Sequence, residues 1–433
     1  MPVSAPAPTI VLFPEGAFGP TNNCVGIGHA LQRRGARVVF VVEESFAGTL
    51  AAQGFEERRM RLKPAPTEPE QPGQFWKDFI RETAPQFRRP PIEQLETLVR
   101  PIWSELMAGA QFVDDRLRAI LAELDPDAVV VDNVIAFPAV VRQGCPWVRI
   151  VSCNPLELPD PALPPAFSGL PTQGPAAERD AFRRREHQLM DPLRADFNAF
   201  VQDRGAPPLA PGRFIHDSPH CNLTLTPREL DYPRTLRLAP EWHRLESCVR
   251  APDRAYTLPD TLRETGGPLV YCSLGSLGSA DLGLMERLLD LLGTSRYRVI
   301  VSLGPQHQRL ALSPAMAGAE VLPQPAVLPL VDVVITHGGN NTVTESCHFG
   351  KPMVVLPLFW DQHDNAQRVA EMGLGVRLDP YRFADDELIG ALDRLTGDLA
   401  LTAQLEAIGR RLRADPGTER AAALILAAAR SRG

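Results

Sequence analysis

The sequence lacks most features that mark nucleic-acid-binding, metal-binding and membrane proteins. It has only three lysines in 433 residues, a net charge of −7 and no basic stripe, so its charge gives no reason to expect a nucleic-acid partner. Its seven cysteines include no C-x-x-C pair, which excludes the usual zinc and disulfide patterns and favours a reducing cytoplasm. The start, MPVSAPAPT, has no basic segment or apolar core, and no apolar run reaches the roughly 18 residues of a membrane span. We therefore expect a cytoplasmic protein.

The remaining composition is that of an ordinary globular protein. Apolar residues make up 44% and charged residues 22% of the chain, and the length suits two or more domains at roughly 100 to 200 residues each. Arginine, alanine and proline are abundant, a bias typical of a GC-rich bacterial genome.

Short buried strands alternate with helices in the first half of the chain. Apolar runs at 9–14, 37–43, 127–133 and 146–152 predict buried parallel strands, and residues 25–35 are apolar at helical spacing. Strand, helix and strand within about 35 residues form a βαβ unit, which begins a doubly wound sheet. Residues 155–180 are rich in proline, glycine and alanine and predict a long surface loop.

The same alternation of strands and helices begins again after a proline-rich stretch. Further strands are predicted at 268–276, 296–304, 319–324, 332–339 and 352–358, followed by helices. The predicted organisation is an N-terminal domain (1–240), a linker (241–267), a C-terminal domain (268–415) and a terminal helix that packs back on the N-terminal domain (416–433). This is an α/β fold with two Rossmann-like, doubly wound parallel sheets facing across a cleft, where ligands are expected at the carboxyl ends of the strands.

One stretch combines the groups that bind a nucleotide. Residues 335–346 read ITHGGNNTVTES, a strand end, a glycine turn and a helix start. A helix N-terminus presents unpaired N–H groups, and glycines let an anion approach the backbone. His337, Asn341 and Thr342 add side-chain donors, while Glu345 can accept from ribose hydroxyls. A glycine turn with a capped helix is the simpler interpretation of this stretch when it is taken alone.

The surrounding pattern resembles a known family. The segment LPQPAVLPLVDVVITHGGNNTVTESCHFGKPMVVLPLFWDQHDNAQRV (322–369) is similar to the C-terminal signature of family 1 glycosyltransferases, the UDP-glycosyltransferase group with a GT-B fold. SLGS (273–276) and GLGVRL (373–378) extend the resemblance, and the chain is similar to bacterial macrolide and natural-product members. The N-terminal half matches more loosely.

The resemblance implies a donor site in the C-terminal domain. Glu345 would bind ribose, Gln324 the base region, and Asp361 with Gln362 the hydroxyls of the donor sugar. The diphosphate would be held by Ser276, His337, Gly339, Asn340, Asn341 and Thr342.

Two positions depart from the family pattern. Val321 stands where many members have a tryptophan that stacks on uracil, so the donor nucleotide can be UDP or dTDP. Pro20 stands where the family commonly has the histidine that takes the acceptor's proton. His29 falls about two helical turns too late to replace it and is expected to be exposed or packed on the helix.

Carboxylates are the remaining candidates for the base. Asp132, at the end of a buried strand, matches the aspartate that orients the family's histidine, and burial would raise its pKa toward a usable value. Its alternative role is to cap the following helix. Glu15 is a weaker candidate for the same task, and Asn22 with Asn23 is expected to cap the first helix or orient the acceptor.

The favoured function is an inverting glycosyltransferase that moves a sugar from a UDP- or dTDP-sugar to a small apolar acceptor such as a polyketide, macrolide or phenolic aglycone. Residues 159–171 are expected to line the acceptor pocket. No metal or other cofactor is expected, because no Asp-x-Asp motif lies near the phosphate site. A non-catalytic nucleotide-sugar-binding protein and a nucleotide-sugar epimerase are the alternatives.

Overall fold

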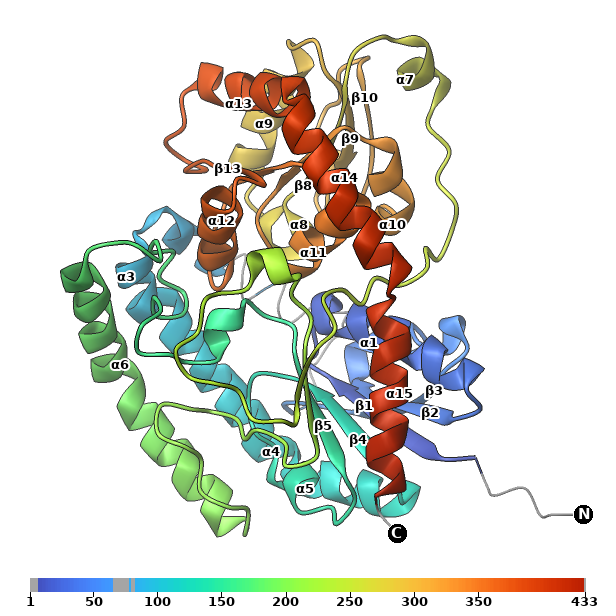
Figure 1. Ribbon diagram of the computed structural model, residues 1–433, viewed down its shortest axis with the longest axis vertical. Coiled ribbons are helices and arrows are strands. Elements are labelled where there is room, and N and C mark those ends of the chain that lie inside the picture. Colours follow the sequence, from blue (N-terminus) through green and yellow to red (C-terminus); the bar gives the residue numbers. More distant parts are fainter. Residues whose placement is uncertain (1–6, 65–77, 79–81, 432–433) are drawn as a thin grey trace, which may run out of the picture.

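Two parallel sheets with helices on both faces form the two halves of the molecule (Figure 1). The computed structural model describes residues 7–64, 78 and 82–431. The predicted pair of doubly wound α/β domains is confirmed. In the described part of the chain, no helix is both long and apolar enough to cross a membrane.

The N-terminal sheet has seven parallel strands in the order β3-β2-β1-β4-β5-β6-β7. Its central strands are buried on both faces, which explains their continuous apolar sequences. The strands are β1 (Thr9–Pro14), β2 (Arg37–Glu43), β3 (Glu56–Met60), β4 (Ala128–Asp132), β5 (Trp147–Val151), β6 (Cys221–Thr224) and β7 (Trp242–Arg244).

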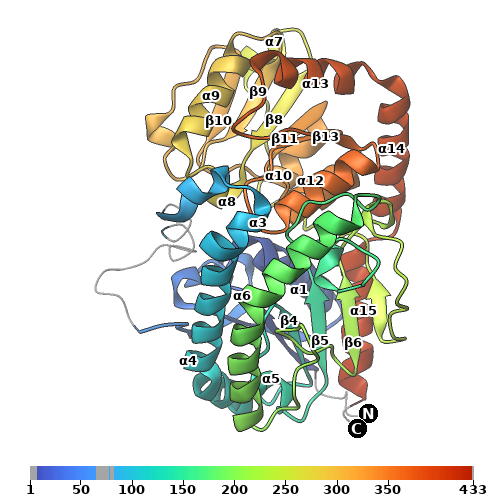
Figure 2. The same ribbon diagram turned by 90° about the vertical axis from the view of Figure 1, so that its left-hand side faces the viewer.

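The helices of this half cover both faces of the sheet, with α4 and α6 side by side on one face (Figure 2). They are α1 (Phe18–Arg33), α3 (Pro91–Gln94), α4 (Arg100–Leu124), α5 (Pro138–Val141) and α6 (Ala176–Asp203). The helix predicted at 25–35 begins earlier, at Phe18, because Pro20 lies in the first turn, where its missing N–H has no partner to lose.

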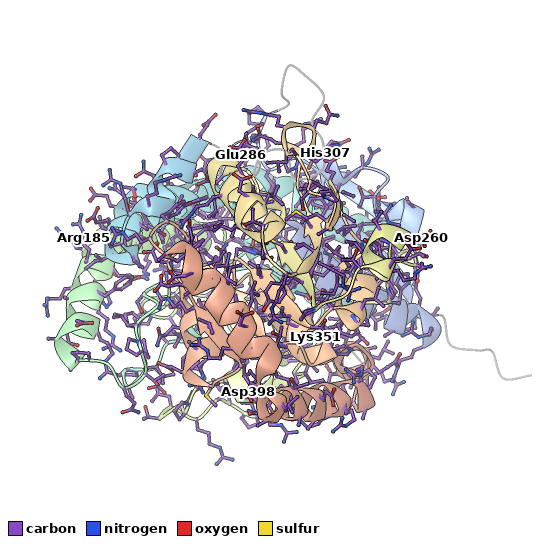
Figure 3. The ribbon with its side chains drawn as sticks, turned by 90° about the horizontal axis from the view of Figure 1, so that it is seen from above. Arg185, Asp260, Glu286, His307, Lys351 and Asp398 are labelled. Atoms are coloured by element: carbon purple, nitrogen blue, oxygen red, sulfur yellow. The ribbon has the colours of Figure 1, made fainter. Side chains whose placement is uncertain are left out.

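The C-terminal sheet has six parallel strands in the order β10-β9-β8-β11-β12-β13. The strands are β8 (Leu269–Ser273), β9 (Arg298–Ser302), β10 (Met316–Ala319), β11 (Val333–Thr336), β12 (Met353–Val355) and β13 (Gly375–Arg377). The helices are α7 (Asp260–Glu264), α8 (Gly275–Gly278), α9 (Leu282–Gly293), α10 (Gln324–Val327), α11 (Asn340–Phe349), α12 (Gln362–Glu371), α13 (Asp385–Gly397) and α14 (Leu399–Ala414). Figure 3 views this half end-on, with Glu286 on α9 and Asp398 between α13 and α14 at its surface.

The last helix, α15 (Gly417–Arg430), leaves the C-terminal half and lies along α1 and strands β4 to β6 (Figure 1). Ala421, Ala422, Ile425 and Ala429 are buried there, in the same apolar cluster as the inner residues of β1 and β2. The final residues of the chain therefore complete the core of the first domain.

Three sequence-based boundaries are wrong. The strand predicted at 319–324 lies at Met316–Ala319 instead, and Gln324 begins α10. Strand β7 falls inside the predicted linker 241–267. It was missed because it is short and its side chains stay partly exposed, so that only the pairing of its backbone with β6 defines it. Residues 155–175 are mostly irregular as expected, but α6 begins at Ala176.

Candidate functional site

The two halves meet where the N-termini of helices α1 and α11 approach each other. The side-chain amide of Asn341, in the first turn of α11, donates to the Gly19 carbonyl of α1 over 2.9 Å. Neither helix has a side chain that caps its N-terminus. Helix N-termini carry unpaired N–H groups and partial positive charge, so this junction is suited to an anion.

Glycines hold the ring of His337 at this junction. A Cβ added at Gly275 would lie 2.7 Å from His337 Cε1, and one added at Gly339 would lie 2.6 Å from Nε2. The ring therefore fits between two backbone segments that only glycine can form at this separation. Gly338 has φ +89°, a left-handed conformation that turns the chain from β11 into α11.

His337 is a neutral hydrogen-bonding group and not a cation at neutral pH. Burial lowers its pKa to about 4, although a hydrogen bond with the Ser273 backbone acts in the opposite direction. The cradle at α11 therefore offers an anion backbone N–H groups, a neutral imidazole and the helix dipole.

Glu345, predicted to bind ribose, lies buried on α11 with both carboxylate oxygens engaged. Gln324 Nε2 donates to Oε2 over 2.6 Å, and Arg250 Nη1 lies 3.5 Å from Oε1. Gln324 also donates to Thr342 and accepts from the Tyr271 hydroxyl, so it orients the carboxylate. No motif in the sequence pointed to Arg250, which comes from the predicted linker.

Asp361 and Gln362, predicted to hold the donor sugar, lie buried at the start of α12. Asp361 Oδ2 accepts from the Asn154 N–H over 2.9 Å and from Asn365 Nδ2 over 3.3 Å. Gln362 Oε1 accepts from the N–H groups of Leu358 and Phe359, at 3.0 and 3.2 Å. These bonds fix the loop after β12 and join it to the N-terminal domain.

A neighbouring carboxylate, Asp364, fastens the long loop of the N-terminal domain to α12. Its two oxygens accept from the N–H groups of Phe167 and Gly169, at 2.6 and 2.8 Å. Burial, and then the charge of Asp361, raises the pKa of Asp364 to about 7 despite these hydrogen bonds. Phe167 and Trp360 both have left-handed backbones and their rings lie 4.2 Å apart across the same junction.

Replacing Asp364 by alanine should loosen this junction. Two buried N–H groups would lose their acceptor, which costs about 1–3 kcal/mol for each group that stays unsatisfied. We expect a lower Tm and faster cleavage between residues 159 and 172 by a protease of broad specificity, read by mass spectrometry. Asp191→Ala, which removes an exposed carboxylate on α6, is the control. Equal cleavage rates in the two variants would show that Asp364 does not fasten the loop.

A cavity of about 210 Å³ opens in the N-terminal domain, at the carboxyl ends of β1 and β2 and against α4. Its apolar wall includes Phe13, Met60, Leu62, Leu106, Phe112, Ile135 and Phe137, and its polar groups are Glu15, Glu43, Ser45, Lys63, Glu105 and Asn133. The expectation that residues 159–171 line such a pocket is wrong for this cavity, because that loop packs on α12. No sequence periodicity identified the wall contributed by α4.

Two carboxylates stand side by side at the ends of β1 and β4. Pro14 pairs with Asp132, and the Glu15 N–H donates to the Asp132 carbonyl over 2.8 Å. Burial, followed by the charge of Asp132, raises the pKa of Glu15 to about 7. Burial also raises the pKa of Asp132 to about 7, against hydrogen bonds from Ser152 and Asn23.

Asp132 does not cap a helix, since Ser152 Oγ donates to its Oδ1 over 2.6 Å and Asn23 Nδ2 to its Oδ2 over 3.5 Å. The expectation that Asn22 and Asn23 cap the first helix is wrong, because α1 begins at Phe18 and both residues lie inside it. His29 packs against Phe55, with ring centroids 4.5 Å apart.

Three other predicted positions lie at the edges of the site. Asn340 begins α11 and is half-buried, and Val321 is 66% exposed, with its carbonyl bonded to Arg254. Ser276 lies in α8, and its side chain is outside the described part of the structure.

Comparisons with known proteins match both the signature and the fold. The erythromycin biosynthesis protein CIII-like C-terminal domain matches residues 286–426. NDP-glycosyltransferase YjiC of Bacillus subtilis (strain 168) is 31% identical over 36% of this chain, which spans 41% of that relative's length. O-mycaminosyltylonolide 6-deoxyallosyltransferase of Streptomyces fradiae is 26% identical over 96% of each chain.

Solved structures share the whole two-domain architecture. The glycotransferase of kitacinnamycin superposes with a TM-score of 0.72 at 24% identity, covering 98% of this chain and 99% of that one. The glycosyltransferase VinC, solved in complex with dTDP, gives 0.64 at 20% identity, covering 98% and 100%. These likenesses establish the GT-B fold, and the matched domain and the full-length relative show that the similarity extends to the sequence.

Proposed function

We propose that the protein transfers a sugar from a nucleoside diphosphate sugar to a small apolar acceptor, with inversion at the anomeric carbon. One observation carries the proposal: the anion cradle at α11 contacts the start of α1, the helix that follows β1 and Glu15, and an apolar cavity opens at the same strand ends. The cradle suits a diphosphate, and the cavity suits a polyketide, macrolide or phenolic aglycone.

The reaction needs three contributions from the chain. A carboxylate takes the proton of the acceptor's hydroxyl while its oxygen attacks the anomeric carbon. The bond between that carbon and the phosphate oxygen breaks, and the nucleoside diphosphate leaves with the electron pair. The N–H groups of α11 and the neutral His337 stabilise the developing charge, which is the main electrostatic task.

On the donor side, the diphosphate is bound by Ser276, Gly339, Asn340, Asn341 and Thr342. Glu345, oriented by Gln324, accepts from ribose, and Asp361 with Gln362 contacts the sugar. The exposed side chain of Val321 offers the base an apolar surface, and the relative solved with dTDP supports a dTDP-sugar beside a UDP-sugar as donor.

The proposal includes no metal or cofactor and a bacterial, cytoplasmic setting. None of the seven cysteines, all of which lie in the described part of the chain, forms a disulfide, which supports a reducing compartment.

The test incubates the protein with UDP- and dTDP-sugars and a panel of macrolide, polyketide and phenolic acceptors, read by mass spectrometry. We expect a glycosylated product whose formation EDTA does not change. Nucleotide binding without turnover or donor hydrolysis would indicate a binding protein, and an altered donor sugar without transfer would indicate an epimerase.

A further inference from the structure

In this chain, the position where the similar family commonly has its catalytic histidine holds a residue that cannot accept a proton. Pro20 occupies it in the first turn of α1, and none of the nine histidines, all of which lie in the described part of the chain, lines the cavity. The group that takes the acceptor's proton must then come from elsewhere at the carboxyl ends of the N-terminal sheet.

Asp132 is poorly placed for that task. Ser152 donates to one of its oxygens and Asn23 approaches the other, and its side chain is 1% exposed. Its neighbour Asn133 reaches the cavity, but Asp132 is not part of the wall. A carboxylate held in this way is fixed in place and turned away from an acceptor in the cavity.

Glu15 has the geometry that Asp132 lacks. It lines the cavity together with Phe13 and Gly16, directly after β1. In the described part of the chain its carboxylate has no hydrogen-bond donor and no ion-pair partner, so both oxygens remain available to an acceptor hydroxyl. We infer that Glu15 is the group that takes the acceptor's proton, and that Asp132 is a positioning residue beside it.

The charged groups around Glu15 make it suitable as the proton acceptor. Asp132 lies on the neighbouring strand, and the carboxylates of Glu157 and Asp361 also face Glu15. Glu43, Glu105 and Lys63 share its cavity. Burial, followed by the charges of Asp132, Glu157 and Asp361, raises the pKa of Glu15 to about 7, where a carboxylate is basic enough to accept a proton and is still partly ionised near neutral pH.

The chemical step balances without another reactant, and it rests on the proposed function. The acceptor O–H bond breaks and its proton goes to a Glu15 oxygen, while the acceptor oxygen forms a bond to the anomeric carbon. The nucleoside diphosphate leaves with the electrons of the broken bond, and Glu15 then releases its proton to solvent.

The test uses the full chain with Glu15→Gln, Asp132→Asn and, as the control, Glu123→Gln at the end of α4. We expect Glu15→Gln to lower kcat by about 10² to 10⁴, the usual contribution of a general base, with unchanged affinity for the nucleoside diphosphate. Glu15→Asp should recover part of the rate, and Glu123→Gln should leave it unchanged.

The dependence of kcat/KM on pH distinguishes the role of Glu15 from that of Asp132. In the native protein kcat/KM should rise with pH up to about 7, because the protonated Glu15 carboxyl cannot accept a proton. Glu15→Gln should remove this limb. Asp132→Asn should move it to lower pH, because a neighbouring negative charge is lost, and should lower the rate less than Glu15→Gln does.

Three outcomes are distinguishable. A native protein that forms no glycoside would overturn the proposed function itself. Native turnover with an undiminished Glu15→Gln variant would overturn only the assignment of Glu15. Loss of the pH limb in Asp132→Asn, with the limb retained in Glu15→Gln, would make Asp132 the base.

Discussion

Replacing Gly339 by alanine is expected to lower the affinity for a nucleoside diphosphate about 100-fold. The added Cβ would lie 2.6 Å from His337 Nε2 and 2.9 Å from Cε1, so the ring must move. Gly275 also lies close to the ring, since a Cβ added there would be 2.7 Å from Cε1, so this segment restricts the movement as well. Displacement of the His337 ring removes a hydrogen-bond donor to the phosphates and disturbs the first N–H groups of α11. Since a hydrogen bond to a charged group contributes about 1.5–3 kcal/mol, losing one accounts for a large loss of affinity.

Calorimetric titration with UDP, dTDP and the corresponding nucleosides measures this effect. The nucleosides lack the phosphates, so their affinity should change much less than that of the diphosphates. Gly390→Ala is the matched control, since a Cβ there meets nothing within 4 Å on the exposed face of α13. If Gly339→Ala binds both diphosphates as the native protein does, the phosphates do not lie at the start of α11.

Replacing Ile425 by alanine is expected to destabilise the N-terminal domain by about 2–5 kcal/mol, the range for truncating a buried isoleucine. Ile425 is fully buried, and α15 packs against α1 and strands β4 to β6. Thermal and urea unfolding give the change, and nucleotide affinity at low temperature should be retained because the donor cradle is in the other domain.

The control for this prediction is Leu399→Ala. Leu399 begins α14 and is 80% exposed, so its truncation removes little buried surface and should change the unfolding free energy by less than about 0.5 kcal/mol. Equal stabilities for Ile425→Ala and Leu399→Ala would show that α15 contributes little to the first domain.

The sequence predicted the inner strands other than β6, because a strand buried on both faces has a continuous apolar sequence. Residues 9–14 and 37–43 coincide with β1 and β2. The edge strands β3 and β7 escaped prediction, since EERRM and WHR have charged or polar side chains that face solvent or neighbouring loops. Their pairing depends on a sheet edge that the sequence does not describe.

The donor side of the candidate site was visible in the sequence because one continuous strand, turn and helix supplies it. His337, Asn341 and Glu345 are brought together by local geometry alone. Arg250 and Asp364 were not found, because the partners that give them a role, Glu345 and the loop at Phe167, lie far away in the chain.

The acceptor side was much less predictable. The cavity draws its wall from the ends of β1 and β2, from the chain after β3 and from α4, and no spacing in the sequence links these segments. The proline-rich loop looked apolar enough to line a pocket, but it packs on α12 instead. Glu15 could be named as a candidate, but only the folded chain shows that it faces the cavity and Asp132 does not.

The path of α15 makes the folding of the first domain depend on residues that are synthesised after the second domain. The face of β4, β5 and β6 that α15 covers is synthesised before residue 225, and its cover only after residue 416. At 5–20 residues per second the ribosome needs on the order of ten seconds or more to make the intervening chain. During that interval an apolar surface of the nascent first domain lacks the helix that covers it in the folded protein.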